Sequence, residues 1–328
     1  MSSLSYLELH RQVSPSIEAE IDSALDRLGP SSSAVKSAIT KLLHHQKLRH
    51  PLSVLPLLVH AIETGTPRPA IPLSAVHVLW WTSACYLDDL ADGNGGTKVD
   101  DLGENEALLA SLVTGHMLPV QVIQSQEVPD SVRGALTAEI TNGWIVAVEG
   151  QLDDMRGDVG GATRDSVITA YRGKSGAPFG MITAMAAILS GAERNEIERW
   201  REFGYVFGIL WQMFNDQDDI LSGRNEDLLN GTVTYLLACA MEGATPECRA
   251  EILALHTVAQ ESVRARSELT DLLLAPAVLR RYRQDINGYR DEAYRIVNDM
   301  GGDPHYVPVL RQLVDLSAQM LLQPRTGQ

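Results

Sequence analysis

The sequence has few cysteines and an excess of acidic over basic residues. Its 328 residues include three cysteines, at positions 85, 239 and 248, and no Cys-x-x-Cys pair. We therefore expect neither a disulfide framework nor a zinc site. Lysine and arginine number 27 against 42 acidic residues, which gives a formal net charge of −15. Nonspecific binding to nucleic acid requires a basic surface, so we expect no nucleic-acid partner.

Long uncharged apolar runs are also missing. The sequence begins Met-Ser-Ser-Leu-Ser-Tyr, without the basic start and apolar stretch of a signal peptide. The longest apolar run, residues 178–192, is shorter than the roughly 18 to 20 residues that cross a bilayer. We therefore expect a cytoplasmic protein that does not insert stably into a membrane.

Apolar residues recur at helical spacing along almost the whole chain, whereas strand-like alternation is absent. Two predicted helices, residues 73–87 and 203–214, are apolar nearly all round, which is typical of the centre of a bundle. The length alone suggests two domains, but no linker separates them. We predict one all-α domain over residues 1–328, with loose tails at 1–15 and 323–328.

A first acidic motif directly follows the apolar helix 73–87. It reads Asp88-Asp89-Leu90-Ala91-Asp92. On a helix, Asp88 and Asp92 lie about 40° apart and share a face. Three carboxylates at one helix end repel each other unless a cation lies among them.

A second acidic motif, Asn215-Asp216-Gln217-Asp218-Asp219, follows the apolar helix 203–214. Asn215 and Asp219 share a face, and Asp216 lies beside them. Hard divalent cations prefer such oxygen ligands. The alternative is that each cluster is a solvated helix end. Two such clusters, each closing a strongly apolar helix, favour a Mg²⁺ site.

At these residues the chain resembles the trans-isoprenyl diphosphate synthase superfamily, in particular its divergent bacterial members. The resemblance extends over most of the sequence, in the same order and with similar spacing. The stretches that carry it are Asp88–Asp92, Glu149-Gly150-Gln151-Leu152-Asp153, Arg172-Gly173-Lys174-Ser175-Gly176, Asn215–Asp219 and Asp227-Leu228-Leu229-Asn230-Gly231-Thr232-Val233-Thr234.

The resemblance implies an all-α helical bundle of the isoprenoid synthase type with a deep central cavity. It implies that three Mg²⁺ ions bridge the two acidic motifs to the diphosphate of an allylic prenyl substrate, and that the protein can form a homodimer. Lys174 corresponds to the family lysine that holds diphosphate oxygens. Arg224 either does the same or is an ordinary loop cation. The implied catalytic residues and metal ligands are Asp88, Asp89, Asp92, Asn215, Asp216 and Asp219.

The chain departs from elongating members of the superfamily where these bind a second diphosphate. The Arg-Arg-Gly after the first motif is missing from residues 93–98. The glycine- and arginine-rich stretch near the N-terminus is replaced by residues 45–51, in which Lys47 and Arg49 are diphosphate-binding candidates out of register. The lysine after the second motif is Thr232. Charged hydrogen bonds contribute about 1.5–3 kcal/mol each, so we expect a weakened second pocket.

An enzyme that forms an allylic cation but holds isopentenyl diphosphate poorly must direct the cation elsewhere. We therefore expect Mg²⁺-dependent ionisation followed by cyclisation to a terpene. One alternative is a prenyltransferase, which either elongates with isopentenyl diphosphate or alkylates another acceptor. Another is a catalytically idle subunit that partners an active synthase, although such subunits usually lose their aspartates.

Aromatic and small residues on the predicted bundle helices suggest how a hydrocarbon chain is held. Aromatic faces stabilise cations by roughly 0.5–2 kcal/mol each, although core packing explains any single ring as well. In the resembling superfamily, bulky residues one turn before the first motif shorten the product, so the small residues at this place imply room for a chain of about 15 to 20 carbons. The expected cavity-lining residues are Trp80, Trp81, Ser83, Ala84, Trp144, Phe179, Phe207, Trp211 and Gln212.

Overall fold

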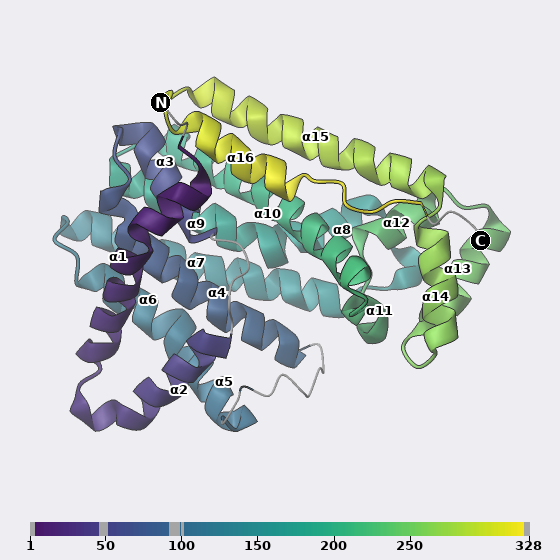
Figure 1. The fold of residues 1–328 in the computed structure, drawn as a ribbon, viewed down its shortest axis with the longest axis horizontal. Helices are drawn as coiled ribbons and strands as arrows, with labels where there is room; N and C mark the ends of the chain where they lie inside the picture. The colour runs from purple at the N-terminus through teal and green to yellow at the C-terminus, as the bar shows by residue number, and fades with distance from the viewer. Residues whose placement is uncertain (1–3, 46–51, 92–98, 100–101, 325–328) are drawn as a thin grey trace. The chain divides into compact units, whose positions relative to one another are not determined.

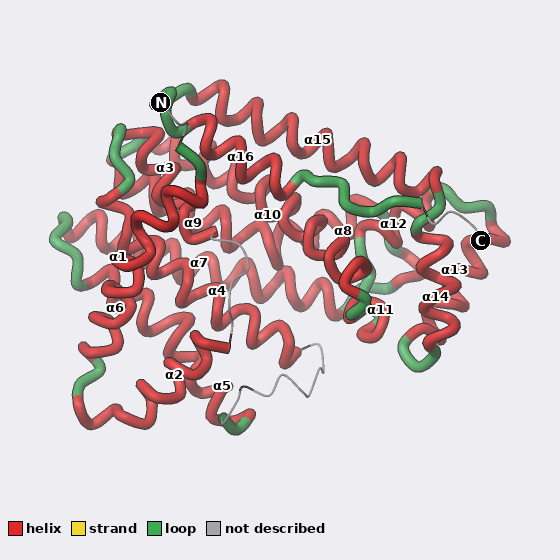
Figure 2. The backbone as a smooth tube through the Cα atoms, in the orientation of Figure 1, coloured by secondary structure: helices red, strands yellow, loops and turns green. Residues whose placement is uncertain are grey.

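The computed structural model describes residues 4–45, 52–91, 99 and 102–324. Every regular element in these ranges is a helix, and no strand occurs among them (Figure 1 and Figure 2). The predicted all-α class is therefore confirmed.

The helices agree closely with the apolar periodicity of the sequence, with breaks at Gly, Pro and Asn. Two short π-helices interrupt the pattern, η4 (Val113–Met117) and η6 (Arg172–Gly176). The α-helices are α1 (Tyr6–Arg27), α2 (Ser33–His45), α3 (Leu55–Thr64), α4 (Ile71–Ala91), α5 (Glu104–Leu112), α6 (Leu118–Gln124), α7 (Asp130–Met155), α8 (Arg164–Tyr171), α9 (Ala177–Ser190), α10 (Arg194–Ser222), α11 (Glu226–Asn230), α12 (Tyr235–Glu242), α13 (Pro246–Ala259), α14 (Val263–Leu273), α15 (Pro276–Met300) and α16 (Val307–Ser317).

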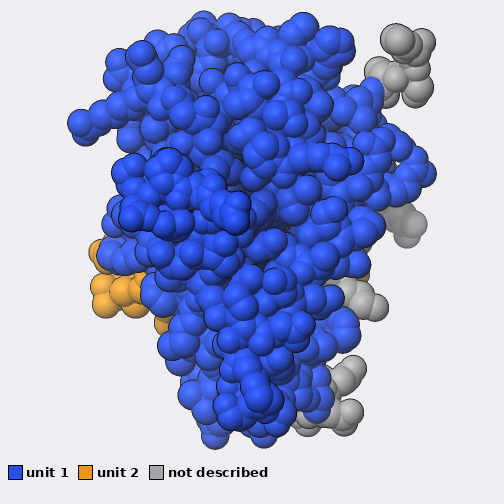
Figure 3. All heavy atoms as spheres, turned by 90° about the vertical axis from the view of Figure 1, so that its left-hand side faces the viewer, with its two compact units in different colours: residues 1–145, 178–204, 297–313 blue, residues 146–177, 205–296, 314–328 orange. Residues whose placement is uncertain are grey.

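The chain divides into two compact units, which Figure 3 colours blue and orange. Unit 1 comprises residues 1–145, 178–204 and 297–313, and unit 2 comprises residues 146–177, 205–296 and 314–328. Each unit is described by itself below. The single domain proposed from the sequence stays a prediction.

In unit 1, the apolar helix α4 packs against α1, α3, α5, α6 and η4. A Cβ on Gly115 of η4 would lie 2.4 Å from the Cβ of Ser83, so only glycine permits this close approach. Ser83 donates a hydrogen bond of 2.8 Å to the carbonyl of Ser111. Trp144 donates one of 2.8 Å to the carbonyl of Gly115. These contacts determine which face of α4 is turned toward its neighbours.

In unit 2, glycines bring the π-helix η6 against two helical segments. A Cβ on Gly150 of α7 would lie 2.3 Å from the backbone nitrogen of Lys174. A Cβ on Gly208 of α10 would lie 2.4 Å from the carbonyl oxygen of Ser175. The backbone around Lys174 is thus held by contacts that no larger residue at either glycine would allow.

Two helical stretches are long and apolar enough to cross a membrane by length and composition. They are Arg68–Ala91 and Glu104–Gln124, and 61% and 50% of their apolar windows are buried. The sequence-based search for apolar runs did not identify them, because polar residues such as Ser74, His77 and Gln121 interrupt their apolar character. Core helices of globular proteins pass the same test, so this finding is weak evidence for insertion.

Candidate functional site

The first acidic motif begins in the last turn of α4, in unit 1. Asp88 and Asp89 are half-buried there, while Asp92 lies outside the described residues. Tyr86, one turn before Asp89, donates a hydrogen bond of 3.1 Å to the carbonyl of Glu104, which joins the end of α4 to the start of α5. Burial, with further contributions from Glu104 and Asp89, raises the pKa of Tyr86.

A half-buried stripe of α4 leads up to Asp88. It contains Trp81 and Ala84 at helical spacing, and both were expected to line a cavity. The ring of Trp81 lies 5.0 Å from that of Phe179, another residue of the expected lining. His77 lies 5.6 Å from the same Phe179 ring.

Three other residues of the expected lining take part in helix packing within unit 1. Trp80 and Ser83 lie on the packed side of α4, and Trp144 lies on α7. Trp80 is 1% exposed, and its ring centroid lies 4.4 Å from that of Trp144. Ser83 is fully buried against Gly115, as described above. Their side chains therefore serve helix packing within unit 1, in contrast to Trp81 and Ala84.

The second acidic motif lies near the end of α10, in unit 2. Asn215 and Gln212 are half-buried on one stripe of the helix. Asp216 and Asp219 are only 3% and 4% exposed, so two carboxylates lie buried within one turn of helix. Two further expected lining residues, Phe207 and Trp211, are also buried, and Trp211 stacks on Phe214 at 5.4 Å.

Asp216 is held from both sides by hydrogen bonds. Tyr171 donates to Oδ2 at 2.5 Å, and Gln212 donates to Oδ1 at 2.8 Å. Gln212 in turn accepts from the hydroxyl of Ser175 at 2.5 Å. Burial raises the pKa of Asp216 to about 7, although the hydrogen bonds from Tyr171 and Gln212 oppose the shift.

Asp219 binds the backbone at the start of α11. Its two carboxylate oxygens accept hydrogen bonds from the backbone nitrogens of Glu226 at 3.0 Å and Asp227 at 3.3 Å. Burial, followed by Asp216 and Asp219, raises the pKa of Asp227 well above its ordinary value. Asp227 thus joins the buried acidic groups of unit 2.

Two cations predicted to bind diphosphate are paired with carboxylates. Lys174 lies 3.0 Å from Asp154, and both side chains are largely buried. Arg224 lies 3.1 Å from Glu226, 3.5 Å from Asp218 and 3.9 Å from Asp219.

The remaining diphosphate-binding candidates, Lys47 and Arg49, lie outside the described residues. The same holds for residues 93–98, where the sequence departs from elongating synthases.

Sequence reasoning missed two residues of this arrangement. The motif Gly-Gln-Leu-Asp drew attention to Asp153, which is exposed, whereas the neighbouring Asp154 forms the ion pair with Lys174. The second residue is Tyr171, which belongs to none of the sequence motifs. No sequence signal identifies its bond to Asp216, because the two residues are 45 positions apart.

The oxygen donors of the two motifs are chemically suited to Mg²⁺. Among the described residues, however, no group of three or more His, Cys, Asp or Glu side chains is arranged to hold a metal ion. The buried Asp216 nonetheless fits a cation-binding role, because it is 3% exposed and both of its hydrogen-bond donors, Tyr171 and Gln212, are neutral side chains.

Comparison with known proteins identifies the family. Residues 100–273, more than half of the chain, match the family model described as polyprenyl synthetase. The chain belongs to the polyprenyl synthetase family. This membership confirms the superfamily resemblance that the acidic motifs suggested.

Two curated relatives of this family member are prenyl diphosphate synthases. It is 26% identical over 217 residues to a short chain isoprenyl diphosphate synthase of Methanothermobacter thermautotrophicus, across 61% of this chain and 65% of that protein, just under two thirds of its length. It is 24% identical over 271 residues to a farnesyl diphosphate synthase of Geobacillus stearothermophilus, across 71% of this chain and 89% of that protein.

Solved structures confirm the isoprenoid synthase fold of this polyprenyl synthetase family member. A geranylgeranyl pyrophosphate synthetase of Pyrococcus horikoshii superposes with a TM-score of 0.79 at 19% identity, covering 96% of this chain and 99% of that one. A polyprenyl synthetase of Streptomyces coelicolor superposes with a TM-score of 0.78 at 16% identity, covering 94% and 97%. At these identities the likeness concerns the fold alone.

Proposed function

We propose that the protein is a Mg²⁺-dependent prenyltransferase that ionises an allylic prenyl diphosphate. The observation that carries this proposal is the buried acidic group of unit 2, in which Asp216 and Asp219 lie within one helical turn. The largely buried ammonium group of Lys174 in the same unit is already paired with Asp154. A bound cation would neutralise this buried negative charge. Membership in the polyprenyl synthetase family suggests that the cation is Mg²⁺.

The proposed roles follow from side-chain chemistry. When bound, Mg²⁺ would supply the positive charge that stabilises the departing diphosphate. Carboxylate and amide oxygens of both motifs would hold the ions, and the ammonium group of Lys174 would bind diphosphate oxygens. The ion pair with Asp154 keeps Lys174 at one place beside the second motif. The proposed metal ligands are Asp88, Asp89, Asp92, Asn215, Asp216 and Asp219.

The named relatives support a reaction in which the allylic prenyl group is transferred to an acceptor. Both named relatives are prenyl diphosphate synthases. For this chain, isopentenyl diphosphate or another nucleophile would attack the allylic carbon after the bond to the diphosphate oxygen breaks. We propose that the protein acts in the cytoplasm on this substrate.

Cyclisation remains a second candidate because of the residues at the second diphosphate pocket. Thr232 stands where elongating synthases have a lysine, and Arg224 is engaged by three carboxylates. Trp81 and Phe179 form an aromatic pair in the unit that carries the first motif. Such rings would stabilise a migrating cation that is not captured by a second diphosphate.

The test is product analysis with the full-length protein. Allylic diphosphates of about 10, 15, 20 and 25 carbons are incubated with Mg²⁺, with and without isopentenyl diphosphate, and products are identified by mass spectrometry. Elongated diphosphates that appear only with isopentenyl diphosphate support prenyl transfer. A hydrocarbon or alcohol formed from the allylic substrate alone supports cyclisation and contradicts prenyl transfer.

Substitution of Asp216 tests the shared ionisation step. We expect Asp216→Asn to lower kcat by about 100-fold or more, because it removes a carboxylate that would hold Mg²⁺ beside the departing diphosphate. Asp153→Asn is the matched control, since that carboxylate is exposed on the neighbouring α7 segment of the same unit. Turnover by Asp216→Asn equal to that of the control would contradict the proposed role of the second motif.

A further inference from the structure

The hydroxyl of Tyr171 lies between the second acidic motif and the start of α12. Tyr171 is the last residue of α8 and is 2% exposed. Its hydroxyl donates to Oδ2 of Asp216 at 2.5 Å and accepts from the backbone nitrogen of Tyr235 at 2.9 Å. All three residues belong to unit 2.

The two contacts determine the direction of the hydroxyl proton. Tyr235 is the first residue of α12, so its N–H has no partner within the helix. A backbone N–H can only donate, and it therefore occupies a lone pair of the Tyr171 oxygen. A phenol carries one hydrogen, which is then left for Asp216. Tyr171 thus donates to the ionised carboxylate of Asp216, which can only accept.

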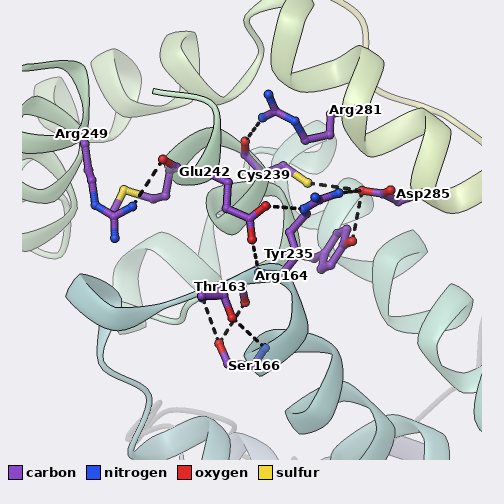
Figure 4. Close-up of polar contacts among 10 residues, drawn as sticks. Thr163, Arg164, Ser166, Tyr235, Cys239, Glu242, Arg249, Arg281 and Asp285 are labelled. Atoms are coloured by element: carbon purple, nitrogen blue, oxygen red, sulfur yellow. Dashed lines mark hydrogen bonds and ion pairs between the residues drawn. The ribbon is translucent and has the colours of Figure 1, made fainter. Parts of the chain in front are cut away.

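The start of α12 is itself held in place. Thr234 caps the helix by accepting from the backbone nitrogen of Leu237 at 3.3 Å. The side chain of Tyr235 donates to Asp285 at 3.1 Å (Figure 4). Arg164 contacts the same carboxylate at 3.0 Å and also binds Glu242 at 2.6 Å. This network joins α8, α12 and α15, so the N–H that orients Tyr171 has a fixed position.

Asp216 keeps coordination capacity under these constraints. Each oxygen of a carboxylate has two lone pairs. Tyr171 uses one on Oδ2 and Gln212 uses one on Oδ1, which leaves one on each oxygen. Hydrogen bonds of this kind orient metal-binding carboxylates, and their removal typically weakens metal affinity 10- to 100-fold.

We propose that Tyr171 is a positioning residue that orients the Asp216 carboxylate for binding of a divalent cation. The inference rests on the proposed function, in which Asp216 is a metal ligand. Tyr171 does not touch the cation or the substrate; it acts through Asp216. The N–H of Tyr235 occupies a lone pair of the Tyr171 oxygen and so directs the hydroxyl hydrogen toward Asp216.

The direct test measures metal binding without turnover. Mn²⁺ uptake is followed by electron paramagnetic resonance in the presence of inorganic pyrophosphate, with no prenyl substrate. We expect Tyr171→Phe to weaken Mn²⁺ binding about 10-fold and to regain turnover at raised Mg²⁺ concentration. Tyr294→Phe is the matched control and should bind Mn²⁺ as the wild type does, because Tyr294 is a half-buried tyrosine of unit 2 whose hydroxyl donates to Asp315 rather than to a member of this network.

A second pair of variants tests the same inference without altering Tyr171. Proline is tolerated at the first position of a helix and lacks the N–H, so Tyr235→Pro removes the donor to Tyr171. Tyr235→Ala loses the same side chain but keeps that N–H. We expect weaker Mn²⁺ binding by the proline variant than by the alanine variant. Thermal unfolding checks that each variant is folded. If Tyr171→Phe does not fold, the comparison of Tyr235→Pro with Tyr235→Ala tests the inference in its place.

The outcomes separate the inference from the proposed function. If the wild type takes up no Mn²⁺ with pyrophosphate, the proposed function itself fails. If the wild type binds Mn²⁺ and folded Tyr171→Phe binds it equally well, the positioning role is overturned while the proposed function stands. The positioning role would also be overturned if the losses of Mn²⁺ affinity in Tyr171→Phe and Asp216→Asn added fully in the double variant. Tyr171 would then act independently of Asp216.

Discussion

At the scale of single residues, His77 is a buried imidazole in an apolar part of unit 1. It is 2% exposed, and the rings of Trp81 and Phe179 lie 5.9 Å and 5.6 Å from it. Within the described ranges, its Nε2 has no hydrogen-bond partner. Burial lowers the pKa of His77 to about 4, although a hydrogen bond with the backbone of Leu52 opposes the shift. A neutral imidazole is therefore buried on α4 itself, about three turns before Asp88.

The lowered pKa of His77 predicts acid sensitivity. Between about pH 6.5 and pH 4 the unfolded chain binds a proton at this histidine and the folded protein does not, so the free energy of unfolding falls as the pH is lowered. The loss from this one group is at most about 3 kcal/mol. We expect His77→Gln to lose less stability over this range than the wild type in urea unfolding at several pH values. Parallel losses in the two proteins would contradict the assignment.

At the scale of elements, the position of Lys174 depends on close backbone contact between α7 and η6. Gly150 and Gly173 meet without side chains, and a Cβ on Gly173 would lie 2.7 Å from the Cα of Gly150. A side chain at either position would collide with backbone atoms, so it could be accommodated only if α7 or η6 shifted as a whole. The π-helix that carries Lys174 is thereby placed beside the second motif within unit 2.

Gly150→Ala should therefore disturb both stability and function. We expect a loss of about 1–3 kcal/mol in the free energy of unfolding from overpacking, together with weaker binding of pyrophosphate measured by calorimetry. Gly288→Ala is the control, because no atom lies within 4 Å of a Cβ at that position of α15. The control should gain roughly 0.5–1 kcal/mol from helix propensity. Equal stability of the two variants would show that η6 adapts to the larger residue.

At the scale of the whole molecule, the chain is acidic, and two of its carboxylates are buried close together. The formal charge of the chain is −15, and Asp216 and Asp219 are almost fully buried. A ligand that binds the folded but not the unfolded state stabilises the protein by mass action. Divalent cations bound with pyrophosphate would offset the repulsion between these two buried carboxylates.

We therefore expect Mg²⁺ with pyrophosphate to raise the melting temperature. At a ligand concentration about 100 times Kd the gain is about 2.7 kcal/mol, which corresponds to several degrees. A chelator should reverse the shift, and Asp216→Asn should show less of it. Differential scanning calorimetry makes the measurement. An unchanged melting temperature of the wild type at saturating Mg²⁺ and pyrophosphate would count against metal binding by the folded chain.

The sequence by itself determined the helical class and the family. Helical periodicity and Gly-Pro breaks are local signals, and acidic motifs at helix ends keep their spacing whatever the surroundings. Asp88 and Asp216 are therefore recognisable as site candidates from their local pattern alone. The preference for cyclisation over prenyl transfer stays a prediction, because it depends on a pocket that no local pattern encodes.

Only the tertiary structure decided which side chains support these candidates. Asp154 rather than Asp153 pairs with Lys174, and Tyr171 rather than a neighbour reaches Asp216. Ser83 faces Gly115, whereas Ala84, one residue later, lies on the half-buried stripe. Adjacent residues on a helix point about 100° apart, so the rotation of each helix against distant partners determines which of them is used. That rotation depends on contacts between segments far apart in the chain, which sequence spacing does not contain.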